Sequence, residues 1–167
     1  MGFDLTGLNP KNSTPKPKWS KGEPLIKTGE DSYAIDPHIK EEYDDYIKTR
    51  MDWQDSTEGA YFRNNVWWWR PLWHFVCHSC DNILTDKDAE QGVFNDGHKI
   101  SKTKAKRIAS RLRRLLKSGE VGAYKSMYDR HLSKLPNDSW GTSYPFDVEN
   151  VERFERFCEN SGGFQIY

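Results

Sequence analysis

Cysteine is scarce in this sequence, and long apolar runs are missing. The three cysteines are Cys77, Cys80 and Cys158. An odd number of cysteines, without a secretory signal, favours free thiols over a disulfide framework. The longest apolar run lies among the tryptophans of residues 64–73, where Arg70 soon interrupts it, so the sequence predicts no membrane-spanning segment. We therefore expect a cytoplasmic protein that has no membrane partner.

A net charge is also missing, because 25 basic residues balance 25 acidic residues. This balance argues against a protein that coats DNA or binds a membrane through a polybasic surface, so nucleic acid is a less expected partner. The charges are nevertheless separated along the chain. Residues 30–58 contain ten acidic and three basic side chains, whereas residues 99–117 contain nine basic side chains and no acidic one. These segments could neutralise each other, or each could face a partner.

Catalytic and metal-binding signatures are missing as well. The sequence shows no paired carboxylates and no serine triad, and its best acid/base pair, His98 with Asp96, has no activating partner. One segment with helical spacing holds four potential metal ligands: His74, Cys77, His78 and Cys80. A structural zinc site normally takes its ligands from two separated pairs, so this set is incomplete. We expect no metal and no cofactor, and a binding protein rather than an enzyme.

The spacing of apolar residues predicts an α+β fold that is mainly α. About five helices are expected, and the clearest begins after Ser101 and buries a stripe of alanine, isoleucine and leucine. Phe3 and Leu5 alternate with Asp4, and the tail also alternates, so we expect a small antiparallel sheet that pairs the two termini. One domain is expected over residues 1–167, with a flexible insert at 10–35.

Proline and capping residues predict where the helices begin. The Asp36-Pro37 pair predicts the start of an acidic helix over residues 36–53, and the Arg70-Pro71 pair predicts the start of a second helix. Both predictions rest on the tolerance of proline in the first helical turn. Three further residues are expected to act as N-caps: Thr85, Ser101 and Asp147.

Tryptophan is clustered in this sequence. Four of the seven tryptophans lie within residues 64–73: Trp67, Trp68, Trp69 and Trp73. Neither a helix nor a strand can point three consecutive side chains at one core, so at least one ring should lie elsewhere and could be buried by a ligand. The rings could stack on a nucleobase, Asn64 and Asn65 could read its edge, and Arg70 could hold a phosphate. Alternatively, two rings pack in the core, the third lies under an inserted segment over residues 10–58, and Arg70 pairs with the acidic helix.

A second candidate site is the polar turn of residues 95–104, which runs into the start of a helix. Its candidate ligand-binding residues are His98, Lys99, Ser101, Lys102 and Lys104. Free backbone N–H groups and the helix dipole at such a position favour an anion. The two-glycine spacing of a phosphate-binding P-loop is missing. The alternative is a solvated basic face that the acidic helix neutralises.

Four stretches of the sequence resemble a family of small uncharacterised proteins of bacteriophages and some bacteria: MGFDL with GLNPK, YFRNNVWWWRPLW, NDGHKISKTKAKRIASRLR, and FDVENVERFERFCENSGGF. The likeness covers residues 1–11, 61–118 and 144–167. The chain departs from the family pattern in its insert at about 12–60 and in lacking the cysteine-rich zinc-knuckle segment that some members carry before the C-terminal helix. Both departures argue against a metal role. The resemblance implies a viral setting and no mechanism.

A viral setting favours a counter-defence role. The leading hypothesis is a non-enzymatic protein that sequesters a nucleotide-like or cyclic-nucleotide signal. In it, Trp67, Trp68 or Trp69 stacks on a base, and phosphate is held by four cations: Arg70, Lys99, Lys102 and Lys104. One alternative is an inhibitor that binds a host defence protein through the acidic helix 36–53. Another is an enzyme that acts on a nucleotide, with His98 as its acid/base.

Overall fold

The computed structural model describes residues 2–11, 14–136 and 139–167, and the chain forms two compact units. The main unit comprises Met1–Lys11 and Glu58–Tyr167, and the inserted unit comprises Asn12–Thr57. The inserted segment has its own helix and hairpin. The single domain expected over residues 1–167 stays a prediction.

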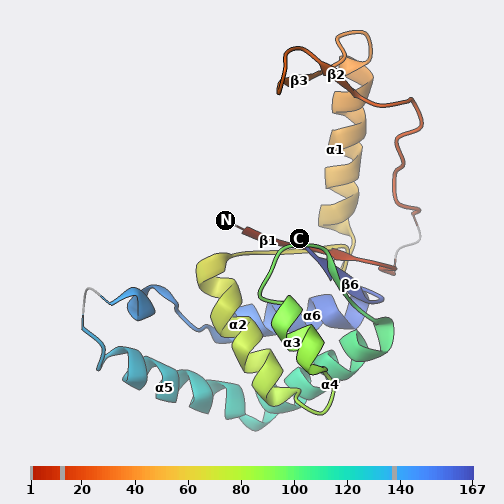
Figure 1. Ribbon diagram of the computed structural model, residues 1–167. Helices are drawn as coiled ribbons and strands as arrows, with labels where there is room; N and C mark the ends of the chain where they lie inside the picture. The colour runs from red at the N-terminus through yellow and green to blue at the C-terminus, as the bar shows by residue number, and fades with distance from the viewer. Residues whose placement is uncertain (1, 12–13, 137–138) are drawn as a thin grey trace. The chain divides into compact units, whose positions relative to one another are not determined.

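The main unit contains a four-stranded antiparallel sheet in which both ends of the chain take part (Figure 1). The order across the sheet is β4 (Tyr61–Asn65), β1 (Gly2–Gly7), β6 (Phe164–Ile166) and β5 (His98–Ile100). Within β1, Phe3 and Leu5 are buried because alternate side chains face the core. Leu5 lies opposite Phe62 on one side and Ile166 on the other. The predicted pairing of the termini is confirmed.

Five α-helices of the main unit lie below the sheet in the view of Figure 1: α2 (Val66–Ser79), α3 (Asp86–Gln91), α4 (Lys102–Ser118), α5 (Glu120–Leu132) and α6 (Val148–Asn160). A 3-10 turn, Trp140–Ser143, lies between α5 and α6. With the helix of the inserted unit, the described residues form six α-helices, which confirms the α+β, mainly α class. Among the described residues, no helix has the length and apolarity needed to cross a membrane.

Local capping chemistry explains the ends of three helices. Thr85 and Asp88 form a reciprocal capping box at the start of α3, the Ser101 hydroxyl accepts a hydrogen bond from the N–H of Lys104, and the Asp147 carboxylate accepts one from Asn150. Gly119 separates α4 from α5 with a φ of 81°, a conformation that other residues rarely adopt. The N-caps at Thr85, Ser101 and Asp147 were predicted from the sequence and are confirmed.

The predicted start of the tryptophan helix at Arg70-Pro71 is wrong. Helix α2 begins at Val66, because the side chain of Asn65 accepts a hydrogen bond from the N–H of Trp68 at 3.1 Å and caps the helix earlier. Pro71 therefore lies inside the helix, where it removes one backbone hydrogen-bond donor. The earlier start places all three consecutive tryptophans in the helix, which decides the direction of each ring.

The inserted unit contains helix α1 (Lys40–Ser56) and a hairpin of β2 (Leu25–Lys27) and β3 (Tyr33–Ile35). The helix begins later than the predicted residue 36, because the carboxylate of Asp36 accepts a hydrogen bond from the N–H of His38 and caps a turn ahead of the helix. Trp19 packs edge-on against Tyr43. The described part of the 10–35 segment thus contains regular structure and a packed ring, while its flexibility stays a prediction.

Candidate functional site

The four clustered tryptophans divide between the core and the surface of the main unit. Trp69 and Trp73 are 0% and 1% exposed and stack on each other with ring centroids 5.2 Å apart. Their indole N–H groups donate to the carbonyls of Gly92 and Ala89. Trp68, by contrast, is 37% exposed. Trp69 was predicted to stack on a ligand, but it has no ring face open to one.

The remaining ring of the triplet, Trp67, belongs to an aromatic group outside the core. It stacks on Trp140 with an interplanar angle of 18°, and its ring centroid lies 4.9 Å from that of Tyr144. Trp140 is 79% exposed. The side chains of three consecutive helical residues span about 200° around the helix axis, so they cannot all point at one core. As expected from the sequence, one ring of the triplet lies in the core and two lie towards the surface.

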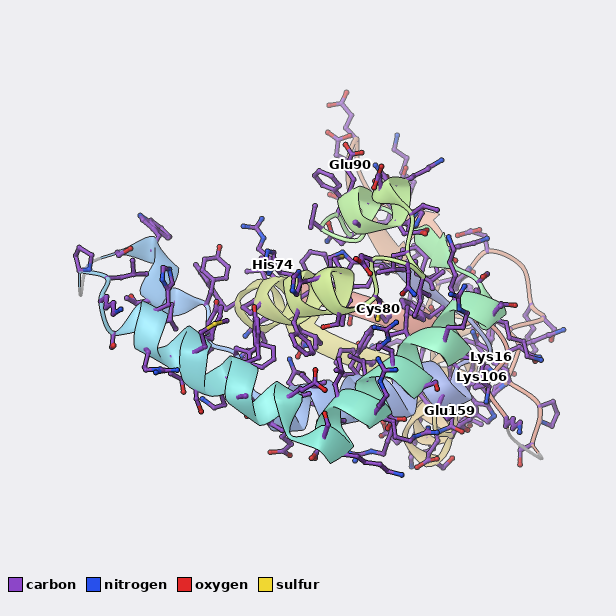
Figure 2. The ribbon with its side chains drawn as sticks, turned by 90° about the horizontal axis from the view of Figure 1, so that it is seen from below. Lys16, His74, Cys80, Glu90, Lys106 and Glu159 are labelled. Atoms are coloured by element: carbon purple, nitrogen blue, oxygen red, sulfur yellow. The ribbon has the colours of Figure 1, made fainter. Side chains whose placement is uncertain are left out.

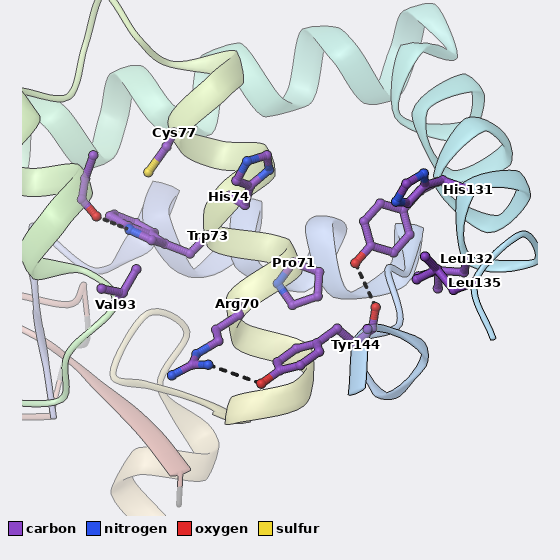
Figure 3. Close-up of a pocket in the computed structure, with 13 residues that line it drawn as sticks. Arg70, Pro71, Trp73, His74, Cys77, Val93, His131, Leu132, Leu135 and Tyr144 are labelled. Atoms are coloured by element: carbon purple, nitrogen blue, oxygen red, sulfur yellow. Dashed lines mark hydrogen bonds between the residues drawn. The ribbon is translucent and has the colours of Figure 1, made fainter. Parts of the chain in front are cut away.

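A pocket of about 660 Å³ opens beside Arg70, between α2, α5 and the segment that follows the 3-10 turn (Figure 3). Apolar or weakly polar groups form most of its wall: Pro71, Trp73, Cys77, Ala89, Val93, Leu132, Leu135 and Gly141. Its polar lining residues are Arg70, His74, Tyr128, His131 and Tyr144. None of the described lining residues is acidic. Such a pocket suits a small molecule that has an apolar body and a negative charge.

Arg70 and Tyr144 form a fixed pair at one end of the pocket. A guanidinium N–H of Arg70 donates to the hydroxyl of Tyr144 at 3.1 Å, and the guanidinium carbon lies 5.9 Å from the centroid of that ring. The hydroxyl of Tyr128 donates to the carbonyl of Tyr144 at 2.8 Å (Figure 3). Tyr144 is therefore held from two helices, while Arg70 is exposed and keeps further donors for a ligand.

The cysteine in the pocket wall behaves as an apolar group. Burial raises the pKa of the Cys77 thiol to about 12, and nearby Cys80 and Asp88 add to the shift. Burial likewise raises the pKa of Cys80 to about 11. Both thiols are therefore protonated near neutral pH, which disfavours a nucleophilic role. In the described part of the chain, no three His, Cys, Asp or Glu residues are placed to hold a metal ion.

The second predicted site is organised around a buried carboxylate, Asp88. Lys104 forms an ion pair with it, and Nε2 of His98 lies 3.0 Å from one of its oxygens. Burial alone would raise the pKa of Asp88, but hydrogen bonds from Lys104, Thr85 and His98 hold it well below its usual range. Two of the predicted ligand-binding residues, His98 and Lys104, therefore interact with a carboxylate of the protein itself.

The other predicted site residues have varied surroundings. Asn64 is buried and donates to the side chain of Asn150 at 3.1 Å, while Asn65 caps α2. Ser101 caps α4, and both Lys99 and Lys102 are exposed. Of the predicted ligand-binding residues, Arg70 lines the pocket described above. The structure thus does not bring the tryptophan stretch and the 95–104 turn together in that pocket.

Comparisons with protein-family models, curated proteins and solved structures find no match for this chain. Sequence reasoning missed the wall that α5 and the following segment supply, which includes Tyr128, His131 and Leu135. A signal was present in the sequence of α5, which carries Tyr124, Tyr128 and His131 at helical spacing.

Proposed function

We propose that this protein is a non-enzymatic binding protein that captures a nucleotide-like ligand in the pocket beside Arg70. The observation that carries the proposal is the pocket itself, about 660 Å³ in volume, with aromatic and aliphatic walls, a guanidinium at one end and no acidic residue among its described lining. Binding pockets for small molecules typically have volumes of about 300–1,000 Å³ and combine apolar walls with a few polar groups that orient the ligand.

The arrangement suits the two parts of a nucleotide. A base can pack against the rings and leucines of α2 and α5, and stacking of a base on an aromatic ring contributes about 1–3 kcal/mol. A phosphate can bind to Arg70, whose planar guanidinium offers paired donors to an oxyanion. His74 and His131 add ring nitrogens from opposite walls. As in the hypothesis drawn from the sequence, Arg70 binds the phosphate. Tyr128 and Tyr144 replace Trp69 as the rings that stack on the base.

The family resemblance gives this proposal a setting. In a bacteriophage protein, capture of a cyclic nucleotide or a similar molecule would withdraw an immune signal from the host cell. The raised pKa of Cys77 supports capture over catalysis, since the thiol nearest to such a ligand is protonated. The proposal therefore concerns a ligand that is bound and released unchanged.

Substitution of Arg70 provides the direct test. Arg70→Gln is expected to weaken the binding of a nucleotide about tenfold or more, because a charge-assisted hydrogen bond is lost. The measurement is a thermal-shift screen of mono-, di- and cyclic nucleotides, followed by calorimetric titration of the ligands that raise the melting temperature. Arg63→Gln is the control, because Arg63 is an exposed arginine of the same unit that does not line the pocket.

Two results would contradict the proposal. If no nucleotide raises the melting temperature, or if the Arg63 and Arg70 variants bind equally well, the pocket has another role. Native mass spectrometry of protein purified from signal-producing cells would identify a ligand outside the screen. Recovery of that ligand intact after heat denaturation distinguishes capture from hydrolysis.

A second candidate function rests on helix α1 of the inserted unit. Of its 17 residues, Trp53 alone is buried, and Met51 is 57% exposed. A helix that buries so little offers a large surface to a protein partner. We propose, as the alternative, that this acidic surface binds a basic patch of a host defence protein.

Charge reversal tests the alternative. Four exposed acidic residues of α1 would be replaced by lysine: Glu41, Glu42, Asp44 and Asp45. Capture of the host partner is expected to fall at least about tenfold, since the attraction between complementary charges becomes repulsion. The readout is pull-down from host lysate, followed by titration of the captured protein. A control variant makes the same change of total charge by replacing four exposed acidic residues of the main unit with lysine: Asp86, Glu90, Glu149 and Glu152. Equal loss of binding with both sets would contradict the role of α1.

A further inference from the structure

Helix α4 carries eight basic residues and no acidic residue, and the fold neutralises only part of that charge. Lys104 pairs with Asp88. Lys106 pairs with Glu159 of α6, and these two residues are labelled in Figure 2. Arg113 donates to Glu155 at 2.6 Å and to Glu159 at 3.1 Å. These contacts lie along the two flanks of the helix, next to α3 and α6.

Three arginines of α4 have different surroundings. Arg107, Arg111 and Arg114 follow one another at intervals of about one helical turn, so their side chains share one side of the helix. They line a hollow of about 270 Å³ together with Asn82, Ile83 and Ser110. Across residues 2–11, 14–136 and 139–167, no ion pair of these three guanidinium groups is found. Among the residues that the structure describes, none that lines the hollow is acidic.

Asn82 holds two of these arginines in place. A guanidinium N–H of Arg107 donates to the carbonyl of Asn82 at 3.1 Å, and one of Arg111 donates to its side-chain oxygen, also at 3.1 Å. Each guanidinium has five N–H donors, so several remain for another acceptor. Because Asn82 already restricts both side chains, a ligand would lose less free energy in ordering them.

We propose that this hollow is a second binding site, which takes a phosphoryl group. Three neighbouring guanidinium groups and the Ser110 hydroxyl offer more donors than a two-oxygen carboxylate can use. The several oxygens of a phosphoryl group can accept from all of them, and guanidinium forks match its geometry. The site goes beyond the proposed function, since its described lining residues differ from those of the pocket beside Arg70.

The neighbouring surface limits how the ligand can extend. A second hollow of about 460 Å³ shares Arg111 and Arg114 with this site and is also lined by His78, Asp81 and Glu120. The two carboxylates repel an anionic chain that runs in that direction. The phosphoryl group can belong either to a small phosphate ester or to the backbone of a nucleic acid that leaves along the other side.

The test follows the arginine side chains by NMR. Inorganic phosphate, glycerol phosphate and a short single-stranded oligonucleotide without terminal phosphates are titrated separately into the full-length protein. The Nε–H signals of Arg107, Arg111 and Arg114 are expected to shift with saturation, and that of Arg113 to shift much less. Saturation by the first two probes alone indicates a small phosphate ester, and tighter binding of the oligonucleotide indicates a nucleic-acid backbone. Both outcomes support the site.

Variants provide the second arm of the test. Arg111→Gln and Arg114→Gln are each expected to weaken binding about tenfold, and Arg111→Lys to weaken it less because the charge remains. Lys87→Gln, which removes one exposed charge outside the hollow, should change the affinity less than about twofold. The proposal is overturned if no probe saturates any of the three signals, or if Lys87→Gln weakens binding as much as Arg111→Gln. The spectrum of each variant shows that it is folded.

Discussion

Replacing Trp69 by alanine is expected to lower the free energy of unfolding by about 3–5 kcal/mol, whereas replacing Trp68 by alanine should lower it by less than about 1 kcal/mol. The two residues are adjacent in α2 and identical in chemistry, but the Trp69 side chain is fully buried and that of Trp68 is 37% exposed. Comparing the two alanine variants therefore isolates the effect of burial on the free energy of unfolding, because the residue replaced is the same.

The contacts of Trp69 explain the size of the effect. Its ring stacks on Phe3 of β1 at 5.4 Å, and meets Phe154 of α6 edge-on at 5.7 Å. Its indole N–H donates to the carbonyl of Gly92 at 2.8 Å. The alanine variant thus loses apolar contacts to the sheet and to a helix, opens a cavity, and leaves a buried carbonyl without its donor.

Urea unfolding at neutral pH, followed by circular dichroism, measures both variants. If the alanine variant of Trp69 does not fold, Trp69→Phe retains an aromatic ring and removes the indole donor, with an expected loss of about 1–3 kcal/mol. Equal destabilisation by Trp68→Ala and Trp69→Ala would contradict the division of the triplet between core and surface.

Replacing Asp88 by asparagine is expected to lower the free energy of unfolding at pH 7 by about 2–4 kcal/mol. The carboxylate is buried and has three partners: it accepts hydrogen bonds from Thr85, pairs with Lys104, and lies 3.0 Å from Nε2 of His98. Removing its charge weakens the N-cap of α3 and leaves the ammonium of Lys104 without its ion pair. Asp86→Asn is the control, because Asp86 lies in the first turn of the same helix and is exposed.

The stability of the protein should depend on pH through the ionisation of Asp88. Since the pKa of Asp88 is lower in the folded protein than in the unfolded chain, its contribution is fully present above the unfolded value of about 3.9. The contribution is lost as the pH falls from there towards the folded pKa. Wild type should therefore exceed Asp88→Asn in stability by the full amount at pH 7 and by clearly less at pH 3. A difference that stays constant with pH would contradict the ionised, hydrogen-bonded carboxylate.

Local interactions explain which parts of the fold could be predicted. The caps at Thr85, Ser101 and Asp147 depend on residues three positions away, and the alternation of Phe3 and Leu5 depends on neighbours two positions away. Such short-range patterns can be read directly from the sequence. The same reasoning failed at Pro71, because two local signals competed and the side chain of Asn65 capped the helix before the proline.

The site depended on contacts between distant segments, and therefore less of it could be predicted. Arg70 was identified from the sequence, but its partner Tyr144 lies 74 residues further along the chain. The basic segment 99–117 was recognised as well, yet its charges alone did not show which would be neutralised. The fold brings Lys104, Lys106 and Arg113 next to acidic side chains, namely Asp88, Glu155 and Glu159. It brings Arg107 and Arg111 next to Asn82, where they line the hollow.

By itself, the sequence determined the helical class, the pairing of the termini, and the fact that three consecutive tryptophans cannot share one core, because each follows from the repeat of the backbone. The tertiary structure alone decided that Trp69 would be the buried ring and that α2 and α5 would enclose a pocket. The reason is that burial and enclosure are properties of surfaces brought together by packing, and no spacing within one segment specifies which distant segment will cover it.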